Sequence, residues 1–206
     1  LREEFISMAM RQRNVSTAPI VSPAKIERYF QNHATNFAVG DQIKIRAIVR
    51  KVLKPEASAE VRKLMLEIDH KIDRSTPFSE MATVYSEGSQ GQLGGDWGWQ
   101  ERNYWMKGLS DIAAGLKPKQ RSTLIGIQRE NDSAYTMHFY DATGKLQKVR
   151  KYGPNATSGK EELIEETAVD PQNAPKLSEP EEYYLILVED KRVARTKALA
   201  EVQDEI

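Results

Sequence analysis

A helical pattern that runs into a glycine-rich turn is the feature that most constrains how this chain can fold. Residues 78–87 place apolar side chains at the three- and four-residue spacing of a helix with one buried face. The apolar positions are Phe78, Met81 and Tyr85. Residues 94–99 follow as Gly-Gly-Asp-Trp-Gly-Trp, which favours a tight turn because glycine adopts backbone angles that other residues avoid. We therefore expect a short amphipathic helix and then a turn that presents Trp97 and Trp99.

Strand and helix patterns surround this segment. Residues 43–49 alternate between apolar and charged or polar side chains, which predicts a strand with one covered face. Ser58 is a good helix cap, and five apolar residues after it predict a long helix with a core-facing stripe. These residues are Val61, Leu64, Met65, Ile68 and Ile72. A further helix is expected to carry Leu109 and Ala113 and to end near Gly115.

Two more strands and two end helices complete the expected elements. Apolar runs predict strands at 124–127 and at 183–188, and the charged flanks of the second run are typical of a central strand. Ser22-Pro23 predicts a helix start, because a hydroxyl cap precedes proline at the first helical position. A closing helix is expected over 193–205, and the spacing of 1–14 predicts the tail of a longer helix.

An irregular stretch separates the last two predicted core strands, from about residue 129 to residue 180. Its first part, 135–152, has the pattern of a hairpin that turns at 141–144. Four basic residues give this hairpin a charged edge, which we expect to be solvated, with docking of an acidic partner as the alternative. They are Lys145, Lys148, Arg150 and Lys151. The second part is acidic and bears prolines, which predicts a mobile loop.

The composition argues against several classes of function. Lysine plus arginine and aspartate plus glutamate both number 30, and this zero net charge indicates neither a nucleic-acid nor an anionic-membrane partner. Cysteine is absent, which excludes thiol catalysis and disulfides. His33, His70 and His138 lack the spacing of metal ligands, and the glycines form no nucleotide-binding pattern, so we expect no metal and no cofactor. No apolar run approaches the roughly 20 residues that span a bilayer.

The helix, the turn and their neighbours together resemble the parvulin family of peptidyl-prolyl cis-trans isomerases. The resemblance rests on Tyr85-Ser86-Glu87 followed by Gly94-Gly95-Asp96-Trp97-Gly98, with support from residues 113–118 (Ala-Ala-Gly-Leu-Lys-Pro). Residues 26–37 are similar to the helix that joins the isomerase module to a helical chaperone domain in SurA-like and PrsA-like bacterial foldases.

The resemblance implies a fold and a domain division. The expected fold is α+β, with a small, mainly antiparallel sheet surrounded by helices. We expect a parvulin-like domain over residues 37–206, interrupted by a hairpin and loop insertion at about 129–180. Residues 1–36 would form an N-terminal helical arm and linker, the remnant of a chaperone domain. The chain starts at Leu1 without methionine or a signal-like segment, so we expect it to be a piece of a longer precursor.

The resemblance also implies which residues form the site. Parvulins hold a proline ring on apolar side chains and place two histidines, with a cysteine or aspartate, beside the amide. The apolar positions correspond here to Trp97, Trp105 and Leu109, with Met106 adjacent. The polar positions correspond to Ala47, Gly88 and Tyr184, so no catalytic residue is assigned and Tyr184 joins the expected substrate-binding group. Leu109 fits a core role equally well, whereas Trp105 fits an exposed binding role.

These features predict assistance to protein folding outside the cytoplasm, by binding of proline-containing or extended client segments. Peptidyl-prolyl isomerase activity is expected to be weak or lost, since the usual polar residues are replaced. A non-catalytic chaperone module is one alternative, and a structural or assembly module whose groove is filled by the hairpin is another. His138 would reach the pocket only if the hairpin folded over it. The expected partners are unfolded or extended polypeptides, and the sequence leaves the oligomeric state open.

Overall fold

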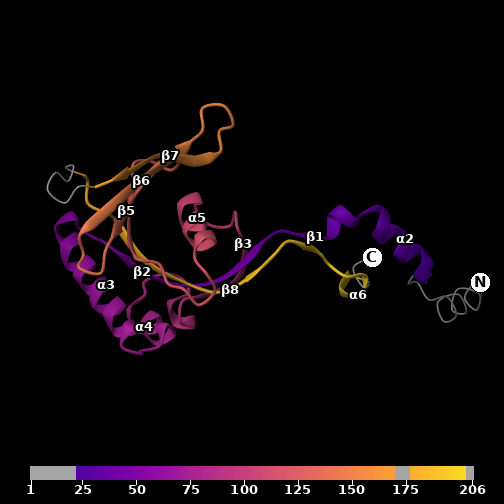
Figure 1. The fold of residues 1–206 in the computed structure, drawn as a ribbon, viewed down its shortest axis with the longest axis horizontal. Coiled ribbons are helices and arrows are strands. Elements are labelled where there is room, and N and C mark those ends of the chain that lie inside the picture. Colours follow the sequence, from indigo (N-terminus) through magenta and orange to yellow (C-terminus); the bar gives the residue numbers. More distant parts are fainter. Residues whose placement is uncertain (1–21, 170–176, 203–206) are drawn as a thin grey trace, which may run out of the picture. The chain divides into compact units, whose positions relative to one another are not determined.

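The computed structural model describes residues 22–169 and 177–202, and the chain divides into two compact units (Figure 1). The first unit contains residues up to 39 and those from 195, and the second contains residues 40–194. None of the helices in the described ranges is long and apolar enough to cross a membrane.

Short elements make up the described part of the first unit. They are α2 (Pro23–Asn32), η1 (Ala34–Phe37), β1 (Ala38–Val39), β9 (Arg195–Thr196) and α6 (Leu199–Val202). The helix α2 begins at the predicted proline, although the Ser22 hydroxyl makes no capping hydrogen bond. The prediction of a closing helix over 193–205 is wrong at its start, because residues 195 and 196 pair with β1 as an antiparallel strand. The helix predicted for 1–14 lies outside the described residues.

A seven-stranded antiparallel sheet forms the frame of the second unit. The strand order is β3-β2-β8-β4-β5-β6-β7. The bounds are β2 (Gln42–Lys51), β3 (Asp96–Glu101), β4 (Leu124–Arg129), β5 (Tyr135–Tyr140), β6 (Leu146–Pro154), β7 (Glu161–Ala168) and β8 (Glu182–Arg192). This arrangement confirms the predicted α+β fold with a mainly antiparallel sheet. It also confirms the interior position of the strand predicted at 183–188.

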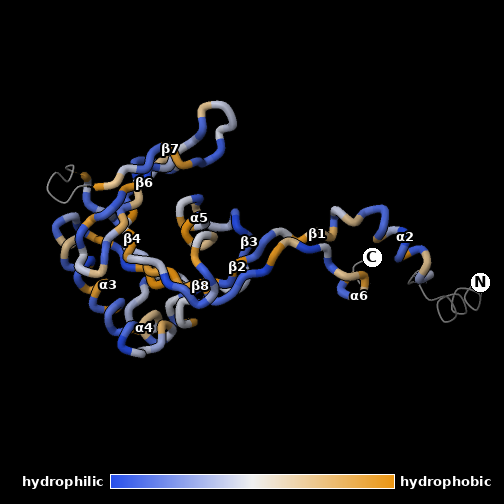
Figure 2. Tube along the Cα trace, viewed as in Figure 1, coloured by the Kyte–Doolittle hydropathy of each residue, from blue (hydrophilic) through white to orange (hydrophobic). Residues whose placement is uncertain are grey.

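Helices pack against both faces of this sheet. Successive side chains on a strand point to opposite faces, so each face has its own set of buried residues. The helices of the second unit are η2 (Pro55–Ala57), α3 (Ser58–Asp73), α4 (Phe78–Tyr85), η3 (Gly91–Leu93) and α5 (Lys107–Gly115). On the face with α3 and α4, the buried residues include Ile48, Met65, Ile68, Phe78 and Leu185. On the face with α5, they include Ile45, Leu109, Ile127, Met137 and Ile186. Figure 2 shows the hydrophobic stretches of β2 and β8 in the middle of the sheet.

The two-sided core corrects two of the sequence predictions. The strand at 43–49 was expected to have one covered face, yet Ala47, Ile48 and Val49 are all buried in succession. Both faces are covered here, because α4 packs on the side opposite to α5. Ser58 begins α3, but its hydroxyl contacts Glu179 and Tyr183 at 2.8 and 2.9 Å and makes no cap.

Residues 135–168 add strands β5, β6 and β7 to the sheet. β5 and β6 form the predicted hairpin, with the Asp141 carboxylate and Gly144 (φ +81°) in the turn. The prediction of a mobile acidic loop after the hairpin is wrong for β7, which pairs with β6. β6 is therefore not a free edge, and its Arg150 forms an ion pair with Glu166 on β7. Residues 170–176 lie outside the described ranges.

Candidate functional site

A cavity of about 400 Å³ lies against the sheet face that carries α5. Its floor comes from alternate residues of two adjacent strands, namely Ile45, Ala47 and Val49 on β2 and Tyr184 and Ile186 on β8. The register places Ala47 opposite Ile186 and Val49 opposite Tyr184, so these side chains share one face of the sheet. The floor is therefore apolar except for the hydroxyl of Tyr184.

Aromatic and aliphatic side chains form the wall of the cavity. Trp97 comes from β3, and Trp105, Met106 and Leu109 come from the start of α5 and the residues before it. The Trp105 ring meets the Tyr104 ring edge-on, with centroids 5.9 Å apart. The Trp105 indole Nε1 is buried and has no hydrogen-bond partner among the described residues. An unpaired buried donor of this kind is costly, which makes this wall a place where a ligand or water acceptor would be stabilising.

The Tyr-Ser-Glu motif fastens the next segment to β2. The Val49 amide donates to the Ser86 hydroxyl at 3.1 Å, and the Glu87 amide donates to the Val49 carbonyl at 2.8 Å. The Lys51 amide then donates to the Glu87 carboxylate at 2.8 Å. These bonds hold Gly88 at the cavity, where a Cβ would lie 3.2 Å from Val49 Cγ2. The motif thus extends the sheet alongside β2 and brings Gly88 to the cavity.

The glycine turn is fastened to the same strand a few residues earlier. The Ala47 amide donates to the Gly95 carbonyl at 2.9 Å. Gly95 has φ +72°, and a Cβ on it would lie 2.4 Å from the Ala47 carbonyl oxygen. Only glycine fits this approach, because the backbone of the turn touches the backbone of β2.

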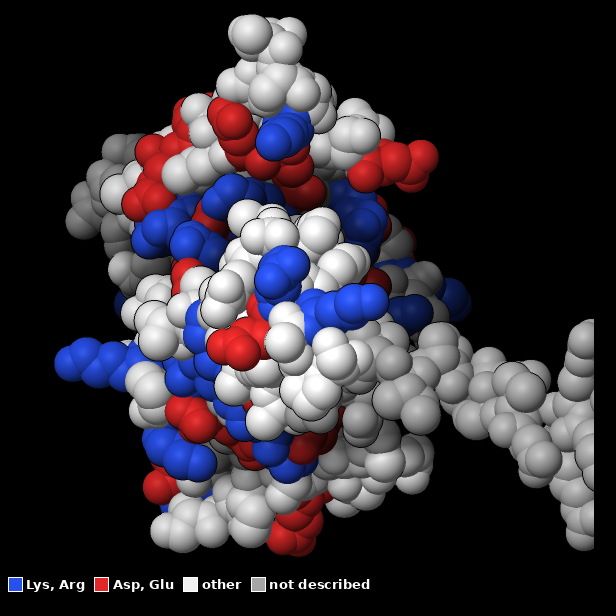
Figure 3. Space-filling view, turned by 90° about the vertical axis from the view of Figure 1, so that its right-hand side faces the viewer, with Lys and Arg blue, Asp and Glu red and all other residues white. Residues whose placement is uncertain are grey.

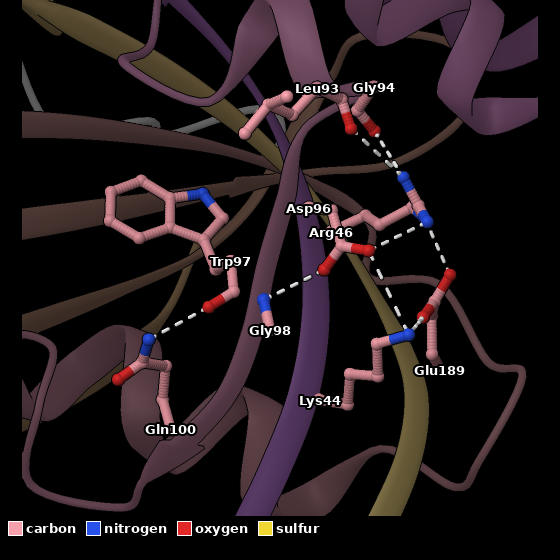
Figure 4. A network of polar contacts seen from close by, with 9 residues as sticks. All are labelled: Lys44, Arg46, Leu93, Gly94, Asp96, Trp97, Gly98, Gln100 and Glu189. Atoms are coloured by element: carbon pink, nitrogen blue, oxygen red, sulfur yellow. Dashed lines mark hydrogen bonds and ion pairs between the residues drawn. The ribbon is translucent and has the colours of Figure 1, made fainter.

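A network of charged side chains anchors the turn from the other face of β2 (Figure 4). The Arg46 guanidinium donates to the carbonyl of Gly94 at 2.9 Å, to Asp96 at 2.9 Å and to Glu189 at 2.5 Å. Lys44 also pairs with Glu189, at 2.7 Å. Burial alone would raise the pKa of Glu189, but hydrogen bonds from Lys44 and Arg46 bring it below its ordinary value. The network fixes Asp96, whose carboxylate accepts the Gly98 amide, and so positions the intervening Trp97.

Polar groups gather at one end of the floor. The Tyr184 hydroxyl donates to Glu182 at 2.8 Å, and Arg129 donates to the same carboxylate oxygen at 3.4 Å. Burial and the neighbouring Glu182 raise the pKa of Tyr184 well above its ordinary value, so the phenol stays protonated. The Tyr184 proton is therefore held by Glu182, and the phenol oxygen is left as an acceptor beside the cavity.

The structure brings the residues predicted for the site around one cavity. All four apolar residues and all three residues at the polar positions line it: Trp97, Trp105, Met106, Leu109, Ala47, Gly88 and Tyr184. Sequence reasoning missed the charged residues of the rim, which are Lys51, Glu87 and Glu182. Glu182 had a signal, since it lies two residues before Tyr184 on the same strand face.

His138 lies elsewhere in the second unit. It is buried among Tyr140, Arg62 and Glu179 and does not line the cavity. Burial lowers the pKa of His138 to about 4, so the ring is neutral at pH 7. His138 thus lies on strand β5 of the hairpin and is buried there. Within the described ranges, no cluster of three or more histidine or acidic side chains could hold a metal ion.

The charged surface gives no sign of a polyanion partner on the face that Figure 3 presents. Acidic and basic side chains are interleaved there around an uncharged area, without a continuous field of one sign. Nucleic acid binding depends on a concentrated basic surface. This face therefore carries no concentrated basic patch of the kind that nucleic acid requires.

Comparison with known proteins connects this architecture to a family. Residues 45–139 match the family model of the Rotamase family, described as the PPIC-type PPIASE domain. Chaperone SurA of Hahella chejuensis is 22% identical over 156 residues, which cover 72% of this chain and 34% of the relative. SurA of Vibrio parahaemolyticus is 24% identical over 144 residues, covering 70% and 33%. This chain thus spans about one third of the length of the curated relatives that it matches.

A solved structure gives a more distant likeness. The crystal structure of a PpiC-type peptidyl-prolyl cis-trans isomerase domain is 16% identical, with a TM-score of 0.44 over 76% of this chain and 96% of that chain. The matched residues 45–139 begin on the cavity floor and include the Tyr-Ser-Glu motif, the glycine turn and α5. The chain therefore carries a PpiC-type rotamase domain of the parvulin class, related to the SurA chaperones.

Proposed function

We propose that this domain binds extended, proline-containing or apolar segments of unfolded client polypeptides in the cavity, as part of a folding factor outside the cytoplasm. The observation that carries the proposal is the aromatic and aliphatic cavity itself. Its size suits a proline ring with its neighbouring residues, and its wall offers rigid aromatic surface at low entropic cost.

We also propose that isomerase catalysis is weak or lost. Rotation about an Xaa-Pro amide faces a barrier of roughly 18–20 kcal/mol, set by amide resonance. An isomerase must favour the twisted amide over both planar forms. Among the described residues, the cavity lining contains no imidazole, and its polar positions hold Ala47, Gly88 and Tyr184. An apolar cavity alone retains only the contribution of removing water from the amide.

A binding role without catalysis is the second candidate, and the cavity supports it equally. A structural role with the groove filled by the insertion has less support, because no described residue of 130–180 lines the cavity. The proposed division keeps residues 37–206 as the parvulin-like domain and residues 1–36 as the arm of a chaperone domain. The proposed location outside the cytoplasm rests on the kinship with SurA and on the absence of cysteine.

The binding test uses a fluorescent Xaa-Pro peptide and two tryptophan variants. Trp105→Ala removes a cavity wall and should weaken binding about 10- to 30-fold, as loss of an aromatic anchor does. Trp99→Ala is the matched control, because Trp99 is covered by Arg192 at 3.7 Å and lies outside the cavity lining. Equal affinities for the wild-type protein and Trp105→Ala would refute this binding site.

The catalytic test measures cis-trans exchange of the same peptide by NMR exchange spectroscopy. We expect binding with little or no acceleration of exchange. Acceleration comparable to that of an active parvulin, abolished by Trp105→Ala, would contradict the proposed loss of catalysis. Localisation is tested separately, by fractionation of cells that produce the full-length protein.

A further inference from the structure

The inserted strands contact the helix that forms the cavity wall. α5 lies between β7 and the central strands β2 and β8, and it contacts all three (Figure 1). Three cavity residues, Trp105, Met106 and Leu109, are on α5 or directly before it. Any element that sets the position of α5 therefore sets the width of the cavity.

The first turn of α5 has no cap of its own. The residue before it is Met106, which offers no side-chain hydrogen bond, and the turn contains no acidic residue. The insertion supplies the missing acceptors. The Lys107 amide donates to the Glu161 carboxylate at 2.8 Å, and the Gly108 amide donates to the Tyr135 hydroxyl at 2.8 Å. A carboxylate at this end of a helix is also favoured by the helix dipole.

The two acceptors are themselves joined. The Tyr135 hydroxyl donates to Glu161, and the Tyr135 ring stacks on Tyr152 of β6 with centroids 5.2 Å apart. Tyr135 and Tyr152 are both almost fully buried. Burial, together with the hydrogen bond to Glu161, raises the pKa of Tyr135 far above its ordinary value, so the hydroxyl keeps its proton.

Gly108 makes the contact between α5 and the hairpin very close. A Cβ at this position would lie 2.1 Å from the Met137 sulfur and 2.9 Å from the Tyr152 ring. The helix backbone at Gly108 therefore packs directly on the side chains of Met137 and Tyr152, with no room for a side chain of its own. This close packing and the two hydrogen bonds act on the same turn.

We propose that the insertion is a positioning device for the cavity: Tyr135 and Glu161 hold the first turn of α5, and thereby place Trp105, Met106 and Leu109 for client binding. The inference rests on the proposed function, because the cavity must bind clients for its width to matter. It assigns the insertion a role in building the groove, in place of filling it.

The test compares three variants of Tyr135 and Glu161 with a control variant of Glu162, the residue next to Glu161 on β7. Tyr135→Phe removes one acceptor and keeps the stacked ring, Glu161→Ala removes the other, and Glu161→Gln restores an uncharged acceptor. Glu162→Ala is the control, because Glu162 contacts the Asn155 side chain and not α5. We expect Tyr135→Phe and Glu161→Ala to weaken peptide affinity about five- to tenfold, while Glu161→Gln recovers most of it and Glu162→Ala changes nothing.

Two further readouts separate positioning from general stability. Hydrogen exchange at the Lys107 and Gly108 amides should accelerate in the weakened variants while exchange in β2 and β8 stays unchanged. The Trp105 indole resonance should shift in the same variants. Unchanged affinity in Tyr135→Phe and Glu161→Ala, with affinity still lost in Trp105→Ala, would overturn the positioning role and leave the proposed function standing. If wild type binds no peptide, the proposed function fails, and an unmoved indole resonance then overturns the positioning role as well.

Discussion

Removal of Arg46 should destabilise the domain, because this guanidinium ties β2 to the glycine turn and to β8. Three of its contacts are hydrogen bonds: to the Gly94 carbonyl and to Asp96, each at 2.9 Å, and to Glu189 at 2.5 Å. Arg46→Met keeps the apolar stem and removes all three. It also leaves two carboxylates whose side chains are only 26% and 18% exposed.

The size of the effect follows from this partial burial. Hydrogen bonds to charged groups contribute about 1.5–3 kcal/mol when buried, and exposed ion pairs contribute about 0.2–1 kcal/mol. The contacts of Arg46 lie between these limits, so about 1 kcal/mol for each of the three is a fair central value. We therefore expect Arg46→Met to lower the free energy of unfolding by about 3 kcal/mol.

Urea unfolding followed by tryptophan fluorescence measures this change, with Lys44→Met as the matched control. Lys44 pairs with the same two carboxylates, at 2.7 and 3.8 Å, but donates no hydrogen bond to the turn within the described residues. Lys44→Met should therefore lower the free energy of unfolding clearly less than Arg46→Met does. High salt should only partly reduce the difference in unfolding free energy between the two variants. Screening weakens the ion pairs, but it does not weaken the hydrogen bond from Arg46 to the Gly94 carbonyl. A loss below about 1 kcal/mol, or one equal to that of Lys44→Met, would refute the anchoring role.

The remaining predictions concern pH, the glycine turn and the polar positions of the cavity. Burial lowers the pKa of His138 from 6.5 to about 4, so the unfolded chain binds a proton that the folded chain excludes. The contribution of His138 to the free energy of unfolding should fall by about 2.5 kcal/mol from pH 7.5 to 4.5. In urea titrations at both pH values, His138→Gln should therefore lose clearly less stability than the wild-type protein over this range. Gly95→Ala should cost about 2–4 kcal/mol, since a Cβ meets the backbone of β2, whereas Gly98→Ala, with φ +67° and open space, should cost about 1 kcal/mol in the same assay. Restoring the family side chains at the polar positions should raise kcat/KM for Xaa-Pro isomerisation by about tenfold in exchange spectroscopy, and peptide binding without any gain would contradict this. The substitutions are Ala47→His, Gly88→Asp and Tyr184→His.

Most elements of the second unit can be predicted from the sequence, because the apolar positions in each local pattern are the residues that the fold buries. The stripe that contains Met65 and Ile68 marks α3, and alternation from Ile43 onward marks β2. Helix ends follow the same logic, and α5 ends at Gly115 as expected. In each case the residues that form the element also carry the signal for it.

The errors arise where a distant segment decides the local structure. Residues 161–168 are acidic and look like a solvated loop, yet they form β7 because Arg150 and Lys151 of β6 lie opposite Glu166 and Glu165. Ser58 looks like a cap, but Tyr183 and Glu179, more than a hundred residues later, take its hydroxyl. The two partners of such a contact are too far apart in the sequence for a local pattern to include both.

The candidate site shows the same division between local and distant information. Its apolar residues and its polar positions follow from the family resemblance, and they gather around one cavity. The charged rim depends on strand register, because Lys51 lies opposite Glu182 only when β2 and β8 pair as they do. Register sets which side chains meet at the cavity mouth, and the sequence pattern of one strand does not contain it.

In this chain, the residues of the family motif differ from the residues at the family's polar positions. Membership of the family can therefore be judged separately from catalytic activity. Ser86 and Gly95 contact the backbone of β2 through a hydroxyl and a close backbone approach, and Asp96 holds the turn through Arg46 and the Gly98 amide. These contacts fasten the turn to β2, and none of them involves a group that would act on a bound peptide. The residues at the family's polar positions, Ala47, Gly88 and Tyr184, line the cavity and are not among these three motif residues. A match to the motif therefore indicates the scaffold around the cavity, and isomerase activity has to be tested by substitutions at those three positions.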